Sequence, residues 1–213
     1  MEPLTVFAEC DTSIVSDAMD AHGLDGVITG IPPAAPTHTA VGRARPVTFE
    51  RAREGGDEEG PTNFPHAMLD AIAADELFVL SGVSRDLSCW GGQASALAAA
   101  ASMAGVVIDG GYRDSSDIRD GSFPVFGRGP TPRSGQKRVR IASTTDPVTV
   151  DGVRVEPTDI VVADATGIVV VPARHADAVA ERAAAIRDEE ADLTDKVSAG
   201  VALEEIRDTH EQF

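Results

Sequence analysis

A continuous apolar run at residues 105–109 (GVVID) places the strongest constraint on the fold. A strand without alternating polar residues is buried on both faces, as in a parallel sheet that helices cover. An alanine-rich segment at residues 91–104 (GGQASALAAAASMA) precedes this run and predicts a helix entered through a glycine pair. Aromatic residues make up only 4% of the chain, so Ala, Val and Ile form its interior. These features together predict an α/β fold.

The remaining segments predict further helices and strands in one domain, residues 1–213. Other helices are expected over residues 11–22, 66–74, 115–120, 173–191 and 201–211, and other strands over residues 26–31, 39–50, 76–82 and 123–129. Residues 137–155 predict a β-hairpin with Asp151 and Gly152 at its turn, and residues 160–172 predict two strands joined at residues 165–167. Residues 51–64 are polar and glycine-rich, which predicts a surface loop without chemistry.

The charge of the chain is strongly acidic, with a net charge of -17 and only two lysines, Lys137 and Lys196. A nucleic-acid interface needs clustered positive charge, and the sequence has none, so we expect no nucleic-acid partner. The acidity is interpreted as a surface suited to high salt, as in a halophile, or as an acidic face that binds a partner. The scatter of Asp and Glu along the chain favours the first interpretation.

Two cysteines, Cys10 and Cys89, establish no disulfide framework and are expected to be small buried thiols. The N-terminal segment lacks a basic region followed by an apolar stretch, so no signal peptide is expected. No apolar run reaches the roughly eighteen residues that a membrane span needs. We therefore expect a soluble, cytoplasmic protein without a membrane partner.

Residues 89–118 contain the pattern that carries chemistry: loop, helix, strand, turn and helix. Gly91 and Gly92 stand where a helix begins, and the free amides there bind a carboxylate or a phosphate. Arg113 and Asp114 follow the apolar strand, where ligands of α/β sheets bind. The arginine can hold a carboxylate through two hydrogen bonds, and the aspartate can bind a hard divalent cation.

A purely structural interpretation of the same residues stays open at this point. Asp114 could cap the helix that is expected from Ser115, and Gly110 with Gly111 could form only a tight turn. A glycine pair before a helix and a single Arg-Asp pair are both weak signals. Spacing alone therefore does not decide between the two interpretations.

Several longer segments resemble the RraA-like family, which includes 4-hydroxy-4-methyl-2-oxoglutarate aldolases. The segments are IVSDAMDAHG, AVGRARPVTF, ELFVLSG, GVVIDGGYRD, FPVFGRGPTPR and DIVVADATGIVVVP, so the likeness covers most of the chain. The resemblance implies a layered α/β sandwich or barrel like the phosphohistidine swivelling domain. It also implies a homotrimer or homohexamer with active sites between subunits, where helices at about residues 173–211 pack on a neighbouring subunit.

The resemblance also implies roles for individual residues. Arg113 corresponds to the substrate-binding arginine of the family and Asp114 to its metal-binding aspartate, the metal being Mg²⁺ or Mn²⁺. The loop whose amides hold the pyruvyl group corresponds to Gly91, Gly92, Gln93 and Ala94. Many family aldolases carry an acidic residue at the position of Gly92, where it orients a water for proton transfer. This departure puts proton handling and the natural substrate in question.

The expected activity is that of a metal-dependent lyase acting on a short 2-oxo diacid. Such an enzyme cleaves a 4-hydroxy-4-methyl-2-oxoglutarate-type substrate to pyruvate and also decarboxylates oxaloacetate, because both reactions pass through the enolate of pyruvate. Lys137 and Lys196 lie outside the candidate site, which disfavours a Schiff-base mechanism. The alternative function is a non-catalytic regulator of ribonuclease or RNA-processing activity that acts through protein–protein binding.

Other residues near these motifs have a functional and a structural interpretation each. Trp90 either packs beneath the loop or borders the substrate, and Asp109 either contacts waters of the metal or holds its turn. Arg128 and Arg133 are interpreted as surface or interface residues rather than pocket residues. Glu189 and Glu190 either reach the active site of a neighbouring subunit or form a solvated helix face. The five histidines are spread out, without zinc-site spacing.

Overall fold

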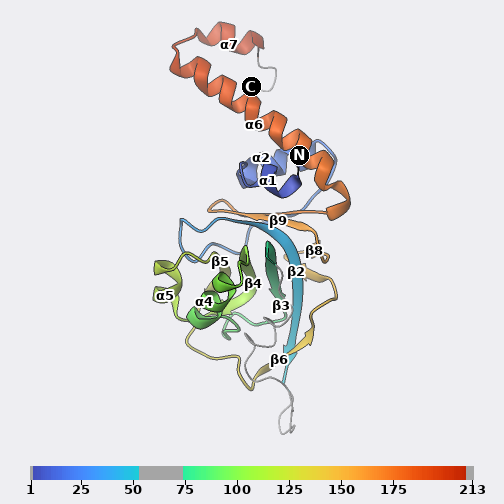
Figure 1. The fold of residues 1–213 in the computed structure, drawn as a ribbon, viewed down its shortest axis with the longest axis vertical. Helices are drawn as coiled ribbons and strands as arrows, with labels where there is room; N and C mark the ends of the chain where they lie inside the picture. Colours follow the sequence, from blue (N-terminus) through green and yellow to red (C-terminus); the bar gives the residue numbers. More distant parts are fainter. Residues whose placement is uncertain (1, 53–73, 210–213) are drawn as a thin grey trace.

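The structure is a computed structural model that describes residues 2–52 and 74–209. It consists of a body built on a curved sheet and a helical part that extends from one end of this body (Figure 1). The helix expected over residues 66–74 and the loop expected over residues 51–64 lie almost wholly outside the described residues.

The body contains an eight-stranded mixed sheet with the order β1-β10-β9-β2-β3-β4-β5, in which β6 also pairs with β2. Strands β2 to β5 run parallel, whereas β1, β9, β10 and β6 are antiparallel to their neighbours. A separate two-stranded sheet is formed by β7 and β8. The strands are β1 Val27–Ile28, β2 Ala40–Arg51, β3 Glu76–Ser81, β4 Gly105–Tyr112, β5 Val125–Pro130, β6 Val139–Ser143, β7 Val148–Val150, β8 Val153–Val155, β9 Ile160–Ala163 and β10 Ile168–Val171.

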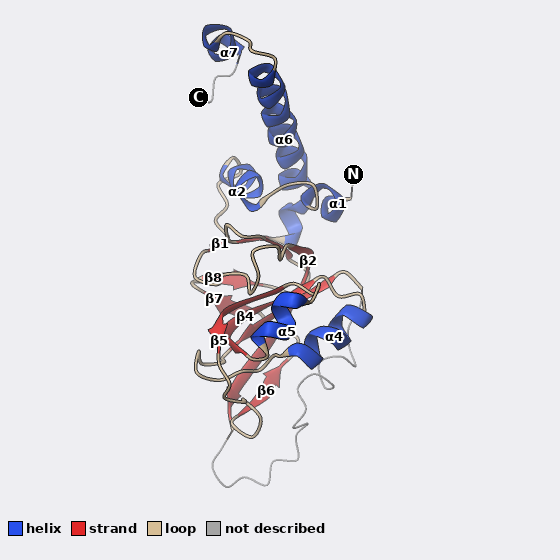
Figure 2. Cartoon of the chain, turned by 90° about the vertical axis from the view of Figure 1, so that its left-hand side faces the viewer, coloured by secondary structure: helices blue, strands red, loops and turns tan. Residues whose placement is uncertain are grey.

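The helices form two groups on different sides of the sheet. Helices α4 and α5 lie beside the parallel strands, whereas α1, α2 and α6 lie beyond the β9–β10 ribbon (Figures 1 and 2). The helices are α1 Pro3–Phe7, α2 Thr12–Asp20, α4 Gly92–Ala100, α5 Ser115–Asp120, the 3₁₀ turn η1 Ala173–His175, α6 Ala176–Ser198 and α7 Leu203–Thr209. Among the described residues, no helix combines the length and the apolarity that a membrane crossing requires.

The β9–β10 ribbon is buried on both faces, which explains its continuous apolar sequence. Ile160 and Val162 pack in the core that α1, α2 and α6 form, while Val161 and Ala163 pack in the core beneath the β7–β8 hairpin. A third core joins α4 and α5 to the other face of the parallel strands. The α/β fold and the parallel arrangement around residues 105–109 are thus as predicted.

Helix α4 ends at Ala100, four residues before the predicted end. Ser102 adopts a left-handed backbone with φ of 59°, and the amide of Met103 donates to the carbonyl of Ala98 at 3.1 Å. This closure is typical of helix C-termini. Strand β4 continues through Gly110 and Gly111 to Tyr112, so the tight turn considered for these glycines is absent.

The hairpin predicted over residues 137–155 is only partly correct. Asp151 and Gly152 do form the turn of a hairpin, but this hairpin comprises only β7 and β8, and β6 pairs with β2 instead. The hydroxyl of Ser143 accepts hydrogen bonds from the amides of Thr145 and Asp146, which turns the chain away before β7 begins. The strand expected over residues 26–31 is likewise limited to the two residues of β1.

Within the described residues, helix α6 is buried only along its first half. Its buried residues are Ala176, Val179, Ala180, Ala183 and Ile186. Beyond them the helix extends outward and α7 folds back beside its end (Figure 2). Val197 is 58% exposed and Leu203 is 75% exposed. The packing of these helices on a neighbouring subunit stays a prediction.

Candidate functional site

The site lies where β4 ends against the loop that leads into α4. Ser88 of this loop pairs with Gly111 as an isolated parallel bridge. Beyond it, the amide of Arg113 donates to the carbonyl of Trp90 at 3.0 Å. These two contacts bring the residues after β4 next to the residues that open α4, although about twenty positions separate them in the sequence.

Asp114 occupies the N-cap position of α5, but its carboxylate makes no cap hydrogen bond there. The backbone of Asp114 is left-handed, with φ of 55° and ψ of 46°. Its Oδ2 accepts from the amide of Gly92 at 3.2 Å, and its Oδ1 pairs with Nε of Arg113 at 3.2 Å. The interpretation of Asp114 as a simple helix cap is therefore wrong, because the carboxylate faces the start of α4 instead.

Gly91 leaves room for the side chains of Asp114 and Arg113, which approach it closely. Its φ of -164° and ψ of -174° are extended values that any residue adopts. A Cβ at this position would lie 2.6 Å from Oδ2 of Asp114 and 2.9 Å from Cγ of Arg113. The glycine therefore serves close contact rather than the backbone turn that the sequence suggested.

The first turn of α4 offers amides to an anion. The first amide that bonds within the helix is that of Ser95, which donates to the carbonyl of Gly91 at 3.0 Å. The amide of Gly92 is taken by Asp114, while the amides of Gln93 and Ala94 meet no acceptor in the described part of the chain. The amide of Gly91 likewise meets no acceptor among the described residues, so three of the four predicted loop amides are available near the positive end of the helix dipole.

Asp117 is a further acidic residue of the site that the sequence reasoning missed. A Cβ at Gly92 would lie 3.2 Å from Oδ2 of Asp117. Asp117 follows Asp114 by three positions in the first turn of α5, and this spacing puts both on one side of the helix. The spacing is the sequence signal that was available. The approach of α5 to α4 could not be predicted from the sequence, because it depends on tertiary packing.

The donor set suits a hard divalent cation. Asp114 and Asp117 supply carboxylate oxygens, which Mg²⁺ and Mn²⁺ prefer over nitrogen and sulfur. In residues 2–52 and 74–209 no group of three or more His, Cys, Asp or Glu side chains is arranged to hold a metal. Mg²⁺ needs only one or two carboxylates, because it keeps several waters or uses ligand oxygens.

Trp90 and Cys89 support the site from below. The Trp90 side chain is buried, its Nε1 donates to Oγ of Ser95 at 2.9 Å, and its ring stacks on Phe123 with a centroid distance of 6.0 Å. Burial raises the pKa of the Cys89 thiol to about 12, so the thiol stays protonated and unreactive. Both residues pack beneath the loop. This was one of the two interpretations of Trp90 and the expectation for Cys89.

Asp109 and Arg128 belong to a structural contact on the other face of the sheet. Arg128 donates from Nε to Asp109 and from Nη2 to Asp151, both at 2.5 Å, and so ties β4 and β5 to the β7–β8 hairpin. Arg133 pairs with Asp86 at 3.1 Å on the surface. These contacts agree with the structural interpretation of Arg128 and Arg133. Asp109 also has a structural contact, but it binds Arg128 instead of holding a turn, because β4 continues beyond this residue.

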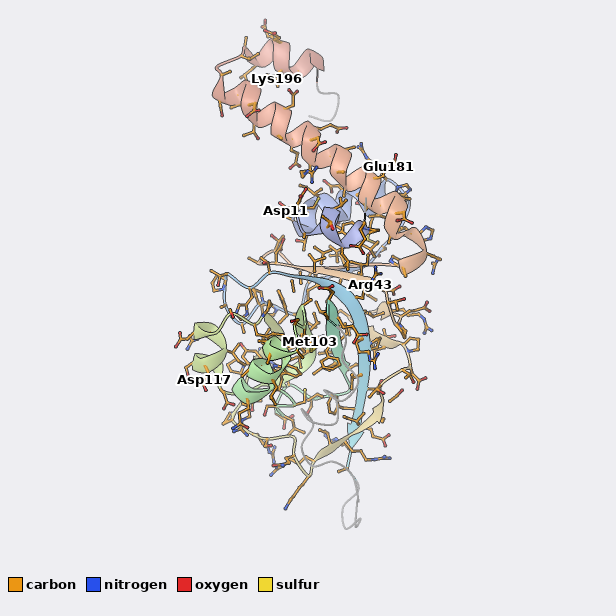
Figure 3. The ribbon with its side chains drawn as sticks, viewed as in Figure 1. Asp11, Arg43, Met103, Asp117, Glu181 and Lys196 are labelled. Atoms are coloured by element: carbon orange, nitrogen blue, oxygen red, sulfur yellow. The ribbon has the colours of Figure 1, made fainter. Side chains whose placement is uncertain are left out.

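Glu189 and Glu190 lie far from this site within one chain. Glu189 pairs with Arg182 of the same helix at 3.3 Å. In Figure 3, Glu181 and Lys196 of α6 lie on the helical part, whereas Asp117 lies on the body beside α4. A role for either glutamate at the site of a neighbouring subunit stays a prediction.

Comparison with known protein families and relatives identifies the family of this chain. The profile of the family described as "RraA-like: Aldolase/RraA" matches residues 12–170. Protein DlpA of Legionella pneumophila is 28% identical over 203 residues, which cover 94% of this chain and 32% of that protein. The chain therefore spans about a third of the length of that relative. A Halalkalibacterium halodurans protein provisionally named 4-hydroxy-4-methyl-2-oxoglutarate aldolase is 29% identical over 84% of this chain and 81% of its own.

Solved structures show the same fold. An uncharacterised protein from Pseudomonas syringae pv. tomato superposes with a TM-score of 0.83 at 29% identity, covering 96% of both chains. RraAS2 of Streptomyces coelicolor, described as an unusual member of the RNase ES inhibitor RraA protein family, superposes with a TM-score of 0.78 at 23% identity. It covers 92% of this chain and 96% of its own.

Proposed function

Since the chain belongs to the RraA-like family, we propose that it is a divalent-metal-dependent lyase that releases pyruvate from a short 2-oxo diacid. Its reactions are aldol cleavage of the 4-hydroxy-4-methyl-2-oxoglutarate type and decarboxylation of oxaloacetate. The observation that carries the proposal is the position of the Asp114 carboxylate, which leaves its own helix uncapped and meets Arg113 and the amide of Gly92.

Arg113 and the start of α4 bind the substrate carboxylate next to the 2-oxo group. Among the described residues, the Arg113 guanidinium is engaged only through Nε, with Asp114, which leaves its terminal nitrogens to donate in pairs to a carboxylate. The amides of Gln93 and Ala94 add the partial positive charge of the helix start. Half of the Arg113 side chain is exposed, so a small acid has access to it.

Asp114 would hold the divalent ion, with Asp117 as the second carboxylate beside it. Such an ion, when bound, stabilises negative charge on the oxygen of the 2-oxo group. The Arg113 guanidinium adds positive charge on the same side and fixes the orientation of the substrate.

The reaction breaks the bond between C3 and C4 of the substrate. The electron pair of that bond moves into the C2–C3 enolate of pyruvate. In the aldol reaction the C4 hydroxyl gives its proton to a water and C4 leaves as a carbonyl compound, whereas in the decarboxylation C4 leaves as carbon dioxide. The enolate then takes a proton at C3. Asp117 stands where an acidic residue at position 92 would project, so we assign to it the orientation of the water that delivers this proton.

The first test follows proton exchange at the methyl group of pyruvate in D₂O, together with pyruvate formation from oxaloacetate, both with Mg²⁺. Asp114→Asn and Arg113→Gln are each expected to lower kcat/KM by about 10²- to 10³-fold, as for the loss of a charge-stabilising group. Asp117→Asn is expected to slow proton exchange more than carbon–carbon cleavage. Asp195→Asn, a change of equal charge on the exposed part of α6, serves as the control and should retain full activity.

A lack of activity under all of these conditions would overturn the lyase proposal. If the unchanged protein neither exchanges the pyruvate protons nor consumes either diacid with Mg²⁺ or Mn²⁺ at low or high salt, the lyase proposal is wrong. The non-catalytic regulator considered from the sequence would then be the better hypothesis.

A further inference from the structure

The loop that follows β3 lies against the end of β4, which carries Arg113. A Cβ at Gly110 would lie 2.7 Å from the carbonyl oxygen of Val83. A Cβ at Gly111 would lie 2.7 Å from the carbonyl oxygen of Arg85 and 2.6 Å from that of Leu87. These two glycines therefore let the main chain of residues 83–87 approach the strand more closely than any side chain would allow.

The side chain of Arg85 reaches across this strand end to β5. Its Nη2 and Nε lie 3.7 Å and 3.9 Å from the place that a Cβ at Gly129 would occupy. Gly129 pairs with Gly111 in the register of β4 and β5, and Arg113 follows Gly111 by two residues. Arg113 and the guanidinium of Arg85 are thus both placed around one pair of glycines at the carboxyl ends of two parallel strands.

The charge of Arg85 is not compensated locally. Across the part of the chain that the structure describes, its exposed side chain has neither a hydrogen bond nor an ion pair. Arg133 and Arg128, which are near in the sequence to this strand end, are paired with Asp86 and with Asp109 and Asp151. In a protein with a net charge of -17, an arginine without a carboxylate partner beside a candidate acid-binding site is available for an anionic ligand.

We propose that Arg85 binds the second carboxylate of the substrate, at the end remote from the 2-oxo group, and thereby selects diacids over monoacids. This inference rests on the proposed lyase function and deepens it. Arg113 and the α4 amides hold the first carboxylate, and Arg85 holds the second through charge-assisted hydrogen bonds. Gly111 and Gly129 carry no side chains, and the groups nearest to a Cβ at Gly111 would be the carbonyls of Arg85 and Leu87 and Cγ2 of Thr131.

The two proposed reactions make different demands on Arg85. In aldol cleavage the second carboxylate stays a carboxylate in the departing 2-oxo acid, so Arg85 stabilises it in both the ground state and the transition state. In oxaloacetate decarboxylation the C4 carboxylate loses its charge and leaves as carbon dioxide. Arg85 then stabilises the ground state more than the transition state, so it lowers KM and does not raise kcat.

The experiment compares Arg85→Gln with the unchanged protein in the presence of Mg²⁺. For 4-hydroxy-4-methyl-2-oxoglutarate, kcat/KM is expected to fall about tenfold to hundredfold, as for the loss of one hydrogen-bonded charge pair. For 4-hydroxy-2-oxopentanoate, which lacks the second carboxylate, kcat/KM should stay unchanged. For oxaloacetate, KM should rise while kcat stays the same or increases. Arg133→Gln removes an equal charge that Asp86 already neutralises, and it should leave all of these values unchanged.

Proton exchange into pyruvate separates this inference from the function on which it rests. Exchange that is as fast in Arg85→Gln as in the unchanged protein shows an intact site, because pyruvate has a single carboxylate. If the diacid and the monoacid then lose activity equally, or if neither loses any, Arg85 does not select diacids and the inference is wrong while the lyase function stands. Absence of exchange in the unchanged protein overturns both.

Discussion

Asp164 accepts hydrogen bonds from two distant parts of the chain. Its carboxylate accepts from the amide and the hydroxyl of Thr12, both at 2.8 Å, and from the amide of Thr166 at 2.8 Å. It thereby ties the first turn of α2 to the turn between β9 and β10. Partial burial raises the pKa of Asp164, but the hydrogen bonds from Thr12, Thr166 and Gly167 outweigh it, and the net pKa is lowered.

A lowered pKa makes the contribution of Asp164 to stability depend on pH. The stabilisation is fully present above the unfolded-state pKa of about 3.9, and it is lost as the pH falls through the lower pKa of the folded state. Asp164→Asn is therefore expected to reduce the free energy of unfolding by about 1 kcal/mol at pH 7, as for the loss of a helix-capping carboxylate. Urea unfolding at several pH values checks this. A difference that stays constant down to pH 2 would contradict it.

The site depends on how three elements pack together, namely α4, β4 and α5. The amide of Arg113 is held by Trp90, and Trp90 is held in turn by Ser95 of α4 and by the stacked ring of Phe123. The start of α4 therefore has a fixed position relative to the end of β4. Close contact at Gly91 depends on this arrangement.

Gly91→Ala should affect activity far more than stability. The added methyl group would overlap mainly with Oδ2 of Asp114 and Cγ of Arg113, and both side chains can move aside at a cost of about 1 kcal/mol or less. Displaced groups no longer meet the substrate correctly, so kcat/KM should fall at least about tenfold. Gly92→Ala is the matched comparison, because its nearest contact, at 3.2 Å from Asp117, is looser and its effect should be smaller. Equal activity of both variants and the unchanged protein would show that this contact has no role.

Local patterns in the sequence predict elements better than they predict contacts. The period of Ile14, Val15, Ala18 and Met19 correctly predicted α2, because a helix buries one face. The uniform apolar sequence of β4 correctly predicted a parallel strand covered on both sides. The pairing of β6 with β2 and the approach of Asp117 to Gly92 were not predictable, because the partners lie far apart in the sequence and no local pattern encodes which segments meet.

The candidate site was predictable where the chemistry lies within a short segment. Arg113, Asp114 and the glycine pair fall within residues 91–114, so their closeness could be inferred from one helix and one strand, whereas their roles were implied by the family resemblance. Arg85 was not found, because it follows a different strand and carries no motif of its own. Its relation to Arg113 depends on the register of β4 with β5 and on the path of the loop after β3.

The molecule as a whole divides into a part that contains the candidate site and the hydrophobic cores, and a smaller part, the end of α6 with α7, that lies outside those cores. Val179, in the first half of α6, is fully buried, whereas Val197 near the end is 58% exposed. Over the described residues, the cores contain no residue of α6 beyond Ile186. The end of α6 therefore adds little to the stability of a single chain.

This division predicts different effects of one substitution at two positions of α6. Val179→Ala should lower the free energy of unfolding by about 2 kcal/mol, because it removes two buried carbon atoms and leaves a cavity. Val197→Ala should change it by less than about 0.5 kcal/mol in a single chain. Denaturant unfolding at low and high protein concentration checks both values. A loss at Val197 that grows with protein concentration would show that another subunit covers the end of α6, as the resemblance to the RraA-like family implies.

The left-handed backbone of Asp114 lowers the stability of the fold at a position where the side chain serves the proposed reaction. Such a conformation costs an L-residue about 1 kcal/mol, whereas glycine adopts it freely. Glycine would remove this backbone cost, but it would also remove the carboxylate that binds the Gly92 amide and Arg113 and on which the proposed reaction depends. The unfavourable backbone is thus retained at a position where the side chain serves the candidate site.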